Sequence, residues 1–189
     1  MAAHHQNKED IKNDEQWIIA AKKDPAHFSY LYDKYFEQIF NFIFRRIDEE
    51  NITADLTSQT FLKALQNLKK YQNRGLPFSA WLYRIAANEV NKHYRRSNRR
   101  YIFSIEENLI KNFIESDNDD AAYEENLQKI INTLKKLDTN DVIILELRFF
   151  EERSFKDIAY ILDIKESSAK MRTYRALEKL KNKINLKYK

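Results

Sequence analysis

The chain has 189 residues, of which 43% are hydrophobic and 33% charged, and its formal net charge is +4. This composition suits a soluble protein with one core or two small ones, and one glycine and two prolines leave little material for hairpins, so we predict an all-α fold. The absence of cysteine excludes disulfides and cysteine-based metal sites. No apolar run approaches the roughly 18 residues that a membrane span needs, so we expect a cytoplasmic protein without membrane insertion.

Histidines give no sign of a metal centre. The four in the chain are His4, His5, His27 and His93, and they lack the spacing of metal ligands. We therefore predict neither a metal site nor a cofactor.

The first half of the chain carries four predicted helices. After a polar tail over residues 1–13, a short helix carries Trp17 and ends before Asp24 and Pro25, a predicted N-cap and first helical residue. A third helix runs from about Ile52 to Lys69, and a fourth starts near Ser79, after a break at residues 73–77. The second helix has apolar residues at steps of three and four, which predicts a buried stripe of Phe28, Leu31, Tyr32, Tyr35, Phe36, Ile39, Phe40, Ile43, Phe44 and Ile47. We predict that residues 14–100 form one helical domain.

Charge is distributed unevenly along the rest of the chain. Residues 84–100 hold six basic residues and one acid, residues 104–125 hold eight acids and one lysine, and residues 153–189 hold eleven Lys or Arg and four acids. The acidic stretch has weak periodicity, which predicts a linker over residues 101–124. Two basic patches joined by an acidic connector indicate two contacts with a polyanion, although an ordinary solvated surface can also cluster its charges.

Residues 125–189 form the second predicted domain. Two amphipathic helices are expected at 127–137 and 138–152, the latter capped by Asp138 or Thr139. Ser154 with Asp157 then forms a capping box for a helix of about nine residues, and a turn at 163–165 leads to a long basic helix that opens at Glu166 or Ser167. This spacing predicts a DNA-binding helix-turn-helix, with an ordinary packed helical hairpin as the alternative.

The last helix is the expected recognition helix, with Ala169, Tyr174 or Leu177, and Leu180 turned inward. Such a helix enters the major groove with its N-terminal turns, so the side chains there reach phosphates and base edges. The residues in reach are Ser167, Ser168, Lys170, Met171, Arg172 and Arg175.

The fourth helix of the first domain carries a second candidate DNA-binding face. Arg84, Asn88, Asn91 and Arg95 follow one another at steps of four, three and four, which makes a polar stripe. Asparagine can bond base edges, and arginine can hold phosphate. The neighbouring rings of Phe78, Trp81 and Tyr83 can stack on unpaired bases, unless rings such as Phe78 and Trp81 simply belong to the core. The residues expected to contact DNA that is being opened are Phe78, Trp81, Arg84, Asn88, Asn91, Lys92, Arg95 and Arg96.

These segments together resemble a known family. FSYLYDKYFEQIFNFIFRRI (28–47), ADLTSQTFLKAL (54–65) and FSAWLYRIAANEVNKHYRR (78–96) resemble, in order, region 2 of bacterial sigma-70 family factors of the extracytoplasmic function group. Residues 134–180 resemble region 4 of the same group, and the likeness extends from about Asp14 to Lys183. It implies an alternative sigma factor that binds core RNA polymerase, directs it to specific promoters and helps melt the −10 element, without being an enzyme itself.

The resemblance also implies partners. Region 2 is expected to dock on the clamp of the β′ subunit of polymerase, with the β subunit as a further contact, and region 4 to read the −35 element as duplex. An anti-sigma factor is expected to hold such a protein inactive. The residues that match the polymerase-docking helix are Asp55, Leu56, Gln59 and Leu62. Departures from the common pattern occur at Thr57 and Ser58 before Gln59, at Asp163 where Gly is frequent, and at Thr173 where Leu is frequent.

Three other classes of protein are alternatives to the sigma factor. A conventional helix-turn-helix repressor or activator needs only the second domain. An enzyme needs a convergent acid, base, nucleophile or metal set, and the chain shows only surface-type carboxylates and scattered histidines. A protein whose basic faces simply bind an acidic partner is the third alternative.

Overall fold

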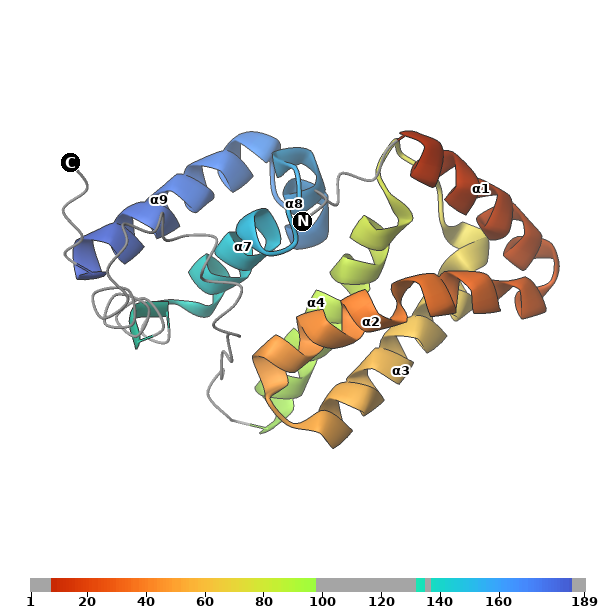
Figure 1. Cartoon of the computed structure of the whole chain (residues 1–189), viewed down its shortest axis with the longest axis horizontal. Coiled ribbons are helices and arrows are strands. Elements are labelled where there is room, and N and C mark those ends of the chain that lie inside the picture. Colours follow the sequence, from red (N-terminus) through yellow and green to blue (C-terminus); the bar gives the residue numbers. More distant parts are fainter. Residues whose placement is uncertain (1–7, 98–131, 135–136, 185–189) are drawn as a thin grey trace, which may run out of the picture.

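Two helical bundles make up the part of the chain that the structure describes. The computed structural model describes residues 8–97, 132–134 and 137–184, and all regular elements in these residues are helices (Figure 1). The first bundle contains α1 (Lys8–Lys23), η1 (Pro25–His27), α2 (Phe28–Ile47), α3 (Glu50–Asn67), η2 (Leu68–Lys70) and α4 (Phe78–Ser97). The second bundle contains α7 (Thr139–Phe149), α8 (Phe155–Leu162) and α9 (Glu166–Ile184). The predicted all-α fold with two helical domains is confirmed, whereas the predicted linker at 101–124 and most of the predicted helix at 127–137 lie outside the described residues.

Local capping fixes the junction between α1 and α2. The side chain of Asp24 accepts a hydrogen bond from the backbone N–H of Ala26 at 2.9 Å, and Pro25 opens η1, as the sequence predicts. α1 starts at Lys8, inside the segment predicted as a polar tail. Residues 8–13, which are mostly polar, are therefore helical.

α2 packs against α1, α3 and α4 of the first bundle, and its C-terminal end reaches the second bundle. Two members of the predicted stripe, Tyr32 and Phe36, are only half-buried. Both contact Phe61 of α3. Phe42 and Arg46, which are outside the predicted stripe, are fully buried: the Phe42 ring packs against Tyr83 of α4, and Arg46 pairs with Glu146 of the second bundle. The members of the predicted stripe that are fully buried are Phe28, Leu31, Tyr35, Ile39, Ile43 and Ile47.

The loop before α4 contains the only glycine of the chain. Gly75 has a φ of 69°, a left-handed conformation that glycine adopts without steric cost, and α4 begins three residues later at Phe78. Leu82, Ala86 and Val90 then turn their side chains into the core. α4 packs against α2 and α3 within its own bundle and against α8 of the other bundle.

The second bundle follows its predicted caps closely. Asp138 accepts from the N–H of Asn140 at 2.9 Å, and the capping box between Ser154 and Asp157 is present. Asp163 ends α8 with a φ of 56°. The predicted helix-turn-helix geometry is therefore formed by α8 and α9.

The inner face of α9 differs in one respect from the prediction. The prediction offered Tyr174 or Leu177 as an inward residue, and Tyr174 is wrong because its side chain is 57% exposed. Thr173 takes the inner place and donates a hydrogen bond from its hydroxyl to the Ala169 carbonyl at 2.9 Å. The buried residues Ala169, Thr173, Ala176 and Leu180 follow steps of four, three and four, which is one helical face.

Candidate nucleic-acid and polymerase surfaces

The N-terminal turns of α9 present the predicted recognition residues to solvent. Ser168 is half-buried, and all the other predicted residues are exposed: Ser167, Lys170, Met171, Arg172 and Arg175. They lie opposite the buried face of Ala169 and Thr173, so packing within the bundle fixes the direction in which they point. A helix with one face anchored and the other polar and cationic can enter a DNA groove without refolding.

The outward face of α4 carries the predicted polar stripe. Asn88 and Asn91 are exposed, as are Arg95 and Arg96 at the end of the helix, and Lys92 is half-buried. Both asparagine amides can therefore offer donors and acceptors to an approaching base.

The aromatic residues at the start of α4 divide between core and surface. Phe78 is only 1% exposed and packs against the rings of Tyr35, Tyr71 and Trp81. Tyr83 is also fully buried, so of the three rings considered for base stacking only Trp81 reaches the surface. Phe78 and Tyr83 therefore belong to the core, whereas Trp81 remains a candidate for stacking on a base.

A hollow of about 340 Å³ lies beside Trp81, between α3 and α4. Tyr71 and Ile85 contribute apolar surface to it, Asn88 contributes an amide, and the ion pair between Lys63 and Glu89 lines one side. Burial raises the pKa of Tyr71 above its ordinary value, so its phenol stays protonated at neutral pH. Aromatic surface beside an amide is the combination that stacks on a base and bonds its edge.

A second hollow, of about 390 Å³, adjoins Trp81 on the side of the second bundle. Three of its lining residues, Lys70, Arg74 and Arg84, are cationic, and Tyr160 of α8 also lines it. Cations beside an aromatic ring suit a nucleotide, whose phosphate and base they can bind at the same time.

The predicted polymerase-docking residues lie on α3. Asp55, Gln59 and Leu62 are exposed on its outer face, whereas Leu56 is buried in the core. Leu62 is 54% exposed, which is unusual for a large apolar side chain on a helix whose inner face is well packed. Leu56 thus supports this face from below and does not belong to its surface.

Comparison with known proteins identifies the family. The family model for sigma-70 region 2 matches residues 31–100, and that for sigma-70 region 4 matches residues 133–182. The RNA polymerase sigma factor SigZ of Bacillus subtilis is 30% identical over 159 residues, which cover 80% of this chain and 83% of SigZ. The ECF RNA polymerase sigma factor BldN of Streptomyces coelicolor is 30% identical over 154 residues, 81% of this chain, and the chain spans 58% of BldN's length.

The chain belongs to the sigma-70 family of RNA polymerase sigma factors, in its extracytoplasmic function group. It is an alternative sigma factor, which binds RNA polymerase for promoter-specific initiation and is not itself an enzyme. The first bundle carries its region 2 and the second its region 4.

Two solved structures share the fold of this sigma factor. That of CnrH in complex with the cytosolic domain of CnrY has a TM-score of 0.63 at 24% identity and covers 93% of this chain and 99% of that chain. That of the sigma factor RpoE from Bartonella quintana in complex with the anti-sigma factor NepR has a TM-score of 0.61 at 20% identity and covers 85% of this chain and 98% of that chain. Both likenesses concern the fold.

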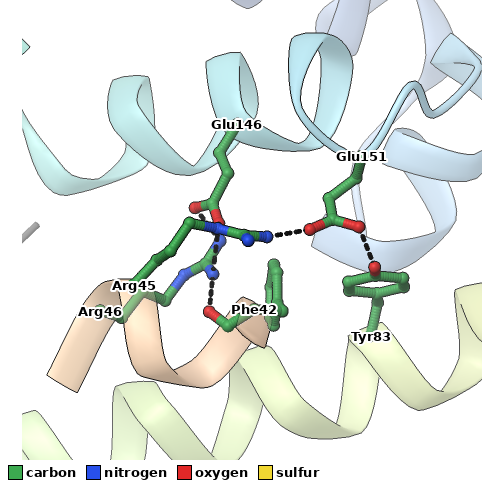
Figure 2. Close-up of polar contacts among 6 residues, drawn as sticks. All are labelled: Phe42, Arg45, Arg46, Tyr83, Glu146 and Glu151. Carbon is green, nitrogen blue, oxygen red and sulfur yellow. Dashed lines mark hydrogen bonds and ion pairs between the residues drawn. The ribbon is translucent and has the colours of Figure 1, made fainter. Parts of the chain in front are cut away.

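Region 2 and region 4 of this sigma factor meet through a buried cluster of charges (Figure 2). Glu146 of α7 accepts from Arg45 Nε at 2.7 Å and from Arg46 Nη1 at 3.0 Å, and its second oxygen lies 2.6 Å from Arg46 Nη2. Glu151, after α7, accepts from Arg45 and from the hydroxyl of Tyr83. We call these five residues the junction cluster.

The charges of the junction cluster are buried, so each needs an opposite charge or a hydrogen-bond partner beside it. Arg46 and Glu146 are both fully buried, and the Arg46 guanidinium also lies 3.4 Å from the centre of the Phe42 ring. Burial disfavours the charged form of Arg45, but the carboxylates of Glu146 and Glu151 outweigh it and raise the pKa of Arg45. Burial, with the neighbouring Glu151 charge, also raises the pKa of Tyr83, so the phenol remains a donor.

Two further arginines cross between the regions. Arg153 Nη1 of region 4 donates to Ser79 Oγ at 3.0 Å, and its guanidinium lies 4.6 Å from the centre of the Tyr83 ring. In the other direction, Arg84 of region 2 donates to the Tyr160 carbonyl at 3.1 Å and pairs with the Asp163 carboxylate at 3.0 Å. Arg84, a predicted DNA-binding residue, therefore has hydrogen-bond donors engaged by region 4.

Sequence reasoning missed the junction cluster. A signal was present, since Arg46 continues the apolar spacing of Ile39 and Phe42, and Glu146 interrupts the apolar run VIILELRFF at 142–150. A charge within a buried stripe indicates a buried partner, because an unpaired one costs too much free energy. The pattern does not say which partner, since the two halves of the pair are about one hundred residues apart in the chain.

Neither a transmembrane helix nor a metal-binding group occurs in the part of the chain that the structure describes. Within 8–97, 132–134 and 137–184, no helix is long and apolar enough to cross a bilayer. The same residues contain no group of three or more His, Cys, Asp or Glu that could hold a metal ion.

Proposed function

We propose that this sigma factor contacts its promoter in two places, through α4 of region 2 and α9 of region 4. The observation that carries the proposal is that each helix has one face anchored in its bundle and an opposite face with exposed amides or guanidinium groups. Such faces supply both phosphate contacts and base contacts. In this proposal, residues 14–100 and 125–189 act as separate DNA-binding domains.

Region 2 contacts the −10 element as it opens. A nontemplate base leaves the stack and enters the hollow beside Trp81, where the indole stacks on it and the Asn88 amide bonds its edge. Asn91 and Lys92 follow along the same helix, and the phosphates of the strand meet Arg84, Arg95 and Arg96. Phe78 supports Trp81 from the core and does not touch DNA.

Region 4 reads the −35 element as duplex. The first turns of α9 enter the major groove, where Arg172 and Arg175 can each bond a guanine in a bidentate manner and Met171 contacts apolar base surface. Ser167, Ser168 and Lys170 lie closest to the N-terminus of the helix, which favours phosphate.

The outer face of α3 docks on the β′ clamp of core RNA polymerase. Leu62 is its apolar anchor, with Asp55 and Gln59 as polar neighbours and Leu56 as support. The β subunit is a further contact of the bound factor. The protein acts in the cytoplasm, where the polymerase is.

An anti-sigma factor is the proposed inhibitor. RpoE of Bartonella quintana, which shares this fold, was solved with the anti-sigma factor NepR. A partner of this kind would bind the same α3 and α4 faces that polymerase and promoter need.

Run-off transcription tests the proposed function. Core polymerase is supplied with a pool of promoter fragments, with and without the protein, and the transcript starts are sequenced. We expect starts that depend on the protein and share two spaced upstream elements. Protein-dependent starts that share no upstream element would contradict the promoter role of α4 and α9.

Leu62→Lys tests the docking face, with Ile19→Lys as the matched control. The two residues are similarly exposed, at 54% and 51%, but Ile19 lies on α1, away from the proposed face. A charge in place of a central apolar anchor weakens polymerase binding about tenfold or more, whereas the control binds as the unchanged protein does. Equal binding by both variants in a pull-down titration would remove α3 from the interface.

A further inference from the structure

The hollow of about 340 Å³ beside Trp81 has a charged pair in its wall. Lys63 of α3 pairs with the Oε1 atom of Glu89 of α4, and both residues line the hollow. We infer that Glu89 is a specificity-determining residue, which admits a base with an exocyclic amino group to this hollow and rejects thymine. The inference rests on the proposed function, because it assigns a preference to the −10 base that enters the hollow.

Glu89 is buried in the wall of the hollow, whereas its neighbour Asn88 is exposed. The side chain of Glu89 is 7% exposed and that of Lys63 is 36% exposed. Trp81, Ile85 and Glu89 follow one another at steps of four, so they share one side of α4. Trp81 and Glu89 are about 12 Å apart along the helix axis, a span that a stacked base and a glutamate side chain can bridge together. A base that stacks on Trp81 can therefore present an edge to Glu89.

The carboxylate of Glu89 accepts hydrogen bonds but cannot donate them. An ionised carboxylate has about four acceptor sites, and Lys63 takes the side of Oε1. Acceptor capacity therefore remains for a ligand in the hollow. Because this side chain is nearly buried, a base without a suitable donor removes water from the carboxylate and does not replace its hydrogen bonds, which costs free energy.

Exocyclic amino groups distinguish three bases from thymine. Cytosine, adenine and guanine each carry such a group, and a glutamate can accept from the cytosine amino group. Thymine carries carbonyl oxygens and a methyl group instead, and its one ring N–H lies between two carbonyls. A carboxylate that approaches this N–H also meets a carbonyl oxygen, which repels it. The expected preference is therefore for an amino-bearing base over thymine.

Lys63 is the positioning residue of the pair. Its ammonium group fixes the direction of the Glu89 carboxylate and offsets a charge that would otherwise repel the phosphates of the strand. The pair also ties α3 to α4, but a buried ion pair adds little net stability. A tie alone predicts no change of base preference when the charge is removed, whereas base selection by Glu89 does.

A second ion pair of region 2 provides a matched control. Asp14 of α1 pairs with Lys34 of α2 at 2.6 Å, and their side chains are 2% and 25% exposed. This pair also joins a buried carboxylate to a partly exposed lysine, but neither residue lines the hollow of Glu89. Asp14→Asn should therefore leave the base preference unchanged, even where it lowers the stability of region 2.

The first test reads the base preference from transcription. Core polymerase is combined with the unchanged protein or a variant, and the promoter found by run-off transcription is supplied as pools in which one −10 position at a time is randomised. We expect one nontemplate position at which thymine is used about tenfold less than the best amino-bearing base. Glu89→Gln keeps the size of the side chain but adds an amide donor for a carbonyl oxygen, so thymine should rise to within about threefold of that base, at this position alone.

An exchange of the two charges tests the same residue in a chain that keeps its ion pair. Lys63→Glu combined with Glu89→Lys retains a pair between α3 and α4 but places a donor where the acceptor was. We expect this double variant to use thymine at the selected position, because lysine donates to a carbonyl oxygen. Asp14→Asn should exclude thymine as the unchanged protein does.

The second test removes the amino group from the base. The polymerase with bound sigma factor is titrated with single-stranded −10 oligonucleotides that carry either the preferred base or the same base without its amino group. The replacements are pyrimidin-2-one for cytosine, purine for adenine and hypoxanthine for guanine. The change should weaken binding about tenfold for the unchanged protein and less than about twofold for Glu89→Gln, which assigns the contact to Glu89.

The outcomes separate this inference from the proposed function. If promoter-dependent starts occur but the unchanged protein accepts thymine at every −10 position, or binds equally well without the amino group, Glu89 does not select the base. Exclusion of thymine by Glu89→Gln and by the double variant, as strong as in the unchanged protein, would also overturn the inference. If protein-dependent starts share no upstream element, the proposed function fails instead.

Discussion

The two helices proposed to touch DNA, α4 and α9, differ in how much of their polar face is open. On α9, Lys170, Arg172 and Arg175 are all exposed, because only the opposite side of the helix is packed. On α4, Asn88 is exposed but Arg84 is held by region 4. Two helices with similar cationic sequences can therefore differ in how many of their cations are free to bind DNA, because neighbouring elements determine which side chains are exposed to solvent.

The largest expected effect concerns the aromatic residues at the start of α4. Phe78→Ala removes a ring that is 1% exposed, and it should lower the free energy of unfolding of region 2 by about 3–5 kcal/mol. Trp81→Ala should cost less, because that ring is half-exposed, yet it should weaken −10 strand binding. Urea titration followed by circular dichroism measures the first effect, and strand binding the second. Equal loss of stability in both variants would mean that Trp81 belongs to the core as fully as Phe78 does.

The next effect concerns α9. Arg172→Ala should weaken binding to the −35 duplex by about 1–3 kcal/mol and relax sequence preference at one base pair, because a bidentate contact to a base edge is lost. Lys181→Ala, farther along the helix, is the control, since an exposed lysine there adds attraction without sequence preference. Competition titrations with a set of single-base variants of the duplex measure both. A uniform loss across all sequences for Arg172→Ala would make it a phosphate contact.

A smaller effect should follow a change on the inner face of α9. Thr173→Leu places a larger side chain between Ala169 and Ala176 at a fully packed position, and it should lower the stability of region 4 by about 1–2 kcal/mol. Tyr174→Leu, at an exposed neighbouring position, should change stability by less than about 0.5 kcal/mol. Thermal unfolding of the full chain compares them. A more stable Thr173→Leu variant would show a void beside the threonine.

The smallest effect concerns the turn between α8 and α9. Asp163→Gly relieves a left-handed backbone, with a φ of 56°, and should stabilise region 4 by about 0.5–1 kcal/mol. It also removes the pair with Arg84, which contributes little because the Asp163 side chain is largely exposed. Asp163→Asn is the control, since it tolerates the same backbone but removes the charge. Hydrogen exchange at the end of α8 separates the two contributions, and slower exchange in the Asn variant than in the Gly variant would contradict the backbone argument.

Elements whose boundaries depend on local chemistry were predictable from the sequence. The cap at Asp24 and the capping box of Ser154 and Asp157 involve residues at most three positions apart, and the turn at Asp163 involves residues at most five positions apart. The buried stripe of α2 was predicted for the same reason, since helical spacing alone reveals it.

Contacts between distant segments were not predictable in this way. Nothing near Arg45 indicates that Glu146 and Glu151 will lie against it, and nothing near Arg84 indicates Tyr160. Phe78 and Trp81 look alike as members of one aromatic cluster. Tyr71 contacts both rings, and only Phe78 is also packed against Tyr35 in the core. The resemblance to a known family predicts the function. The packing of the two regions determines which of the predicted site residues are exposed.

The position of Trp81 gives the molecule an optical reporter of its own. The chain has two tryptophans, and Trp81 lines the hollow that Tyr160 of region 4 also lines, whereas Trp17 stacks on Tyr30 within region 2 at a ring distance of 4.3 Å. In a Trp17→Phe background, emission comes from Trp81 alone. Its wavelength should therefore shift to the red as water enters the hollow, so that each departure of region 4 from α4 is visible without an attached dye.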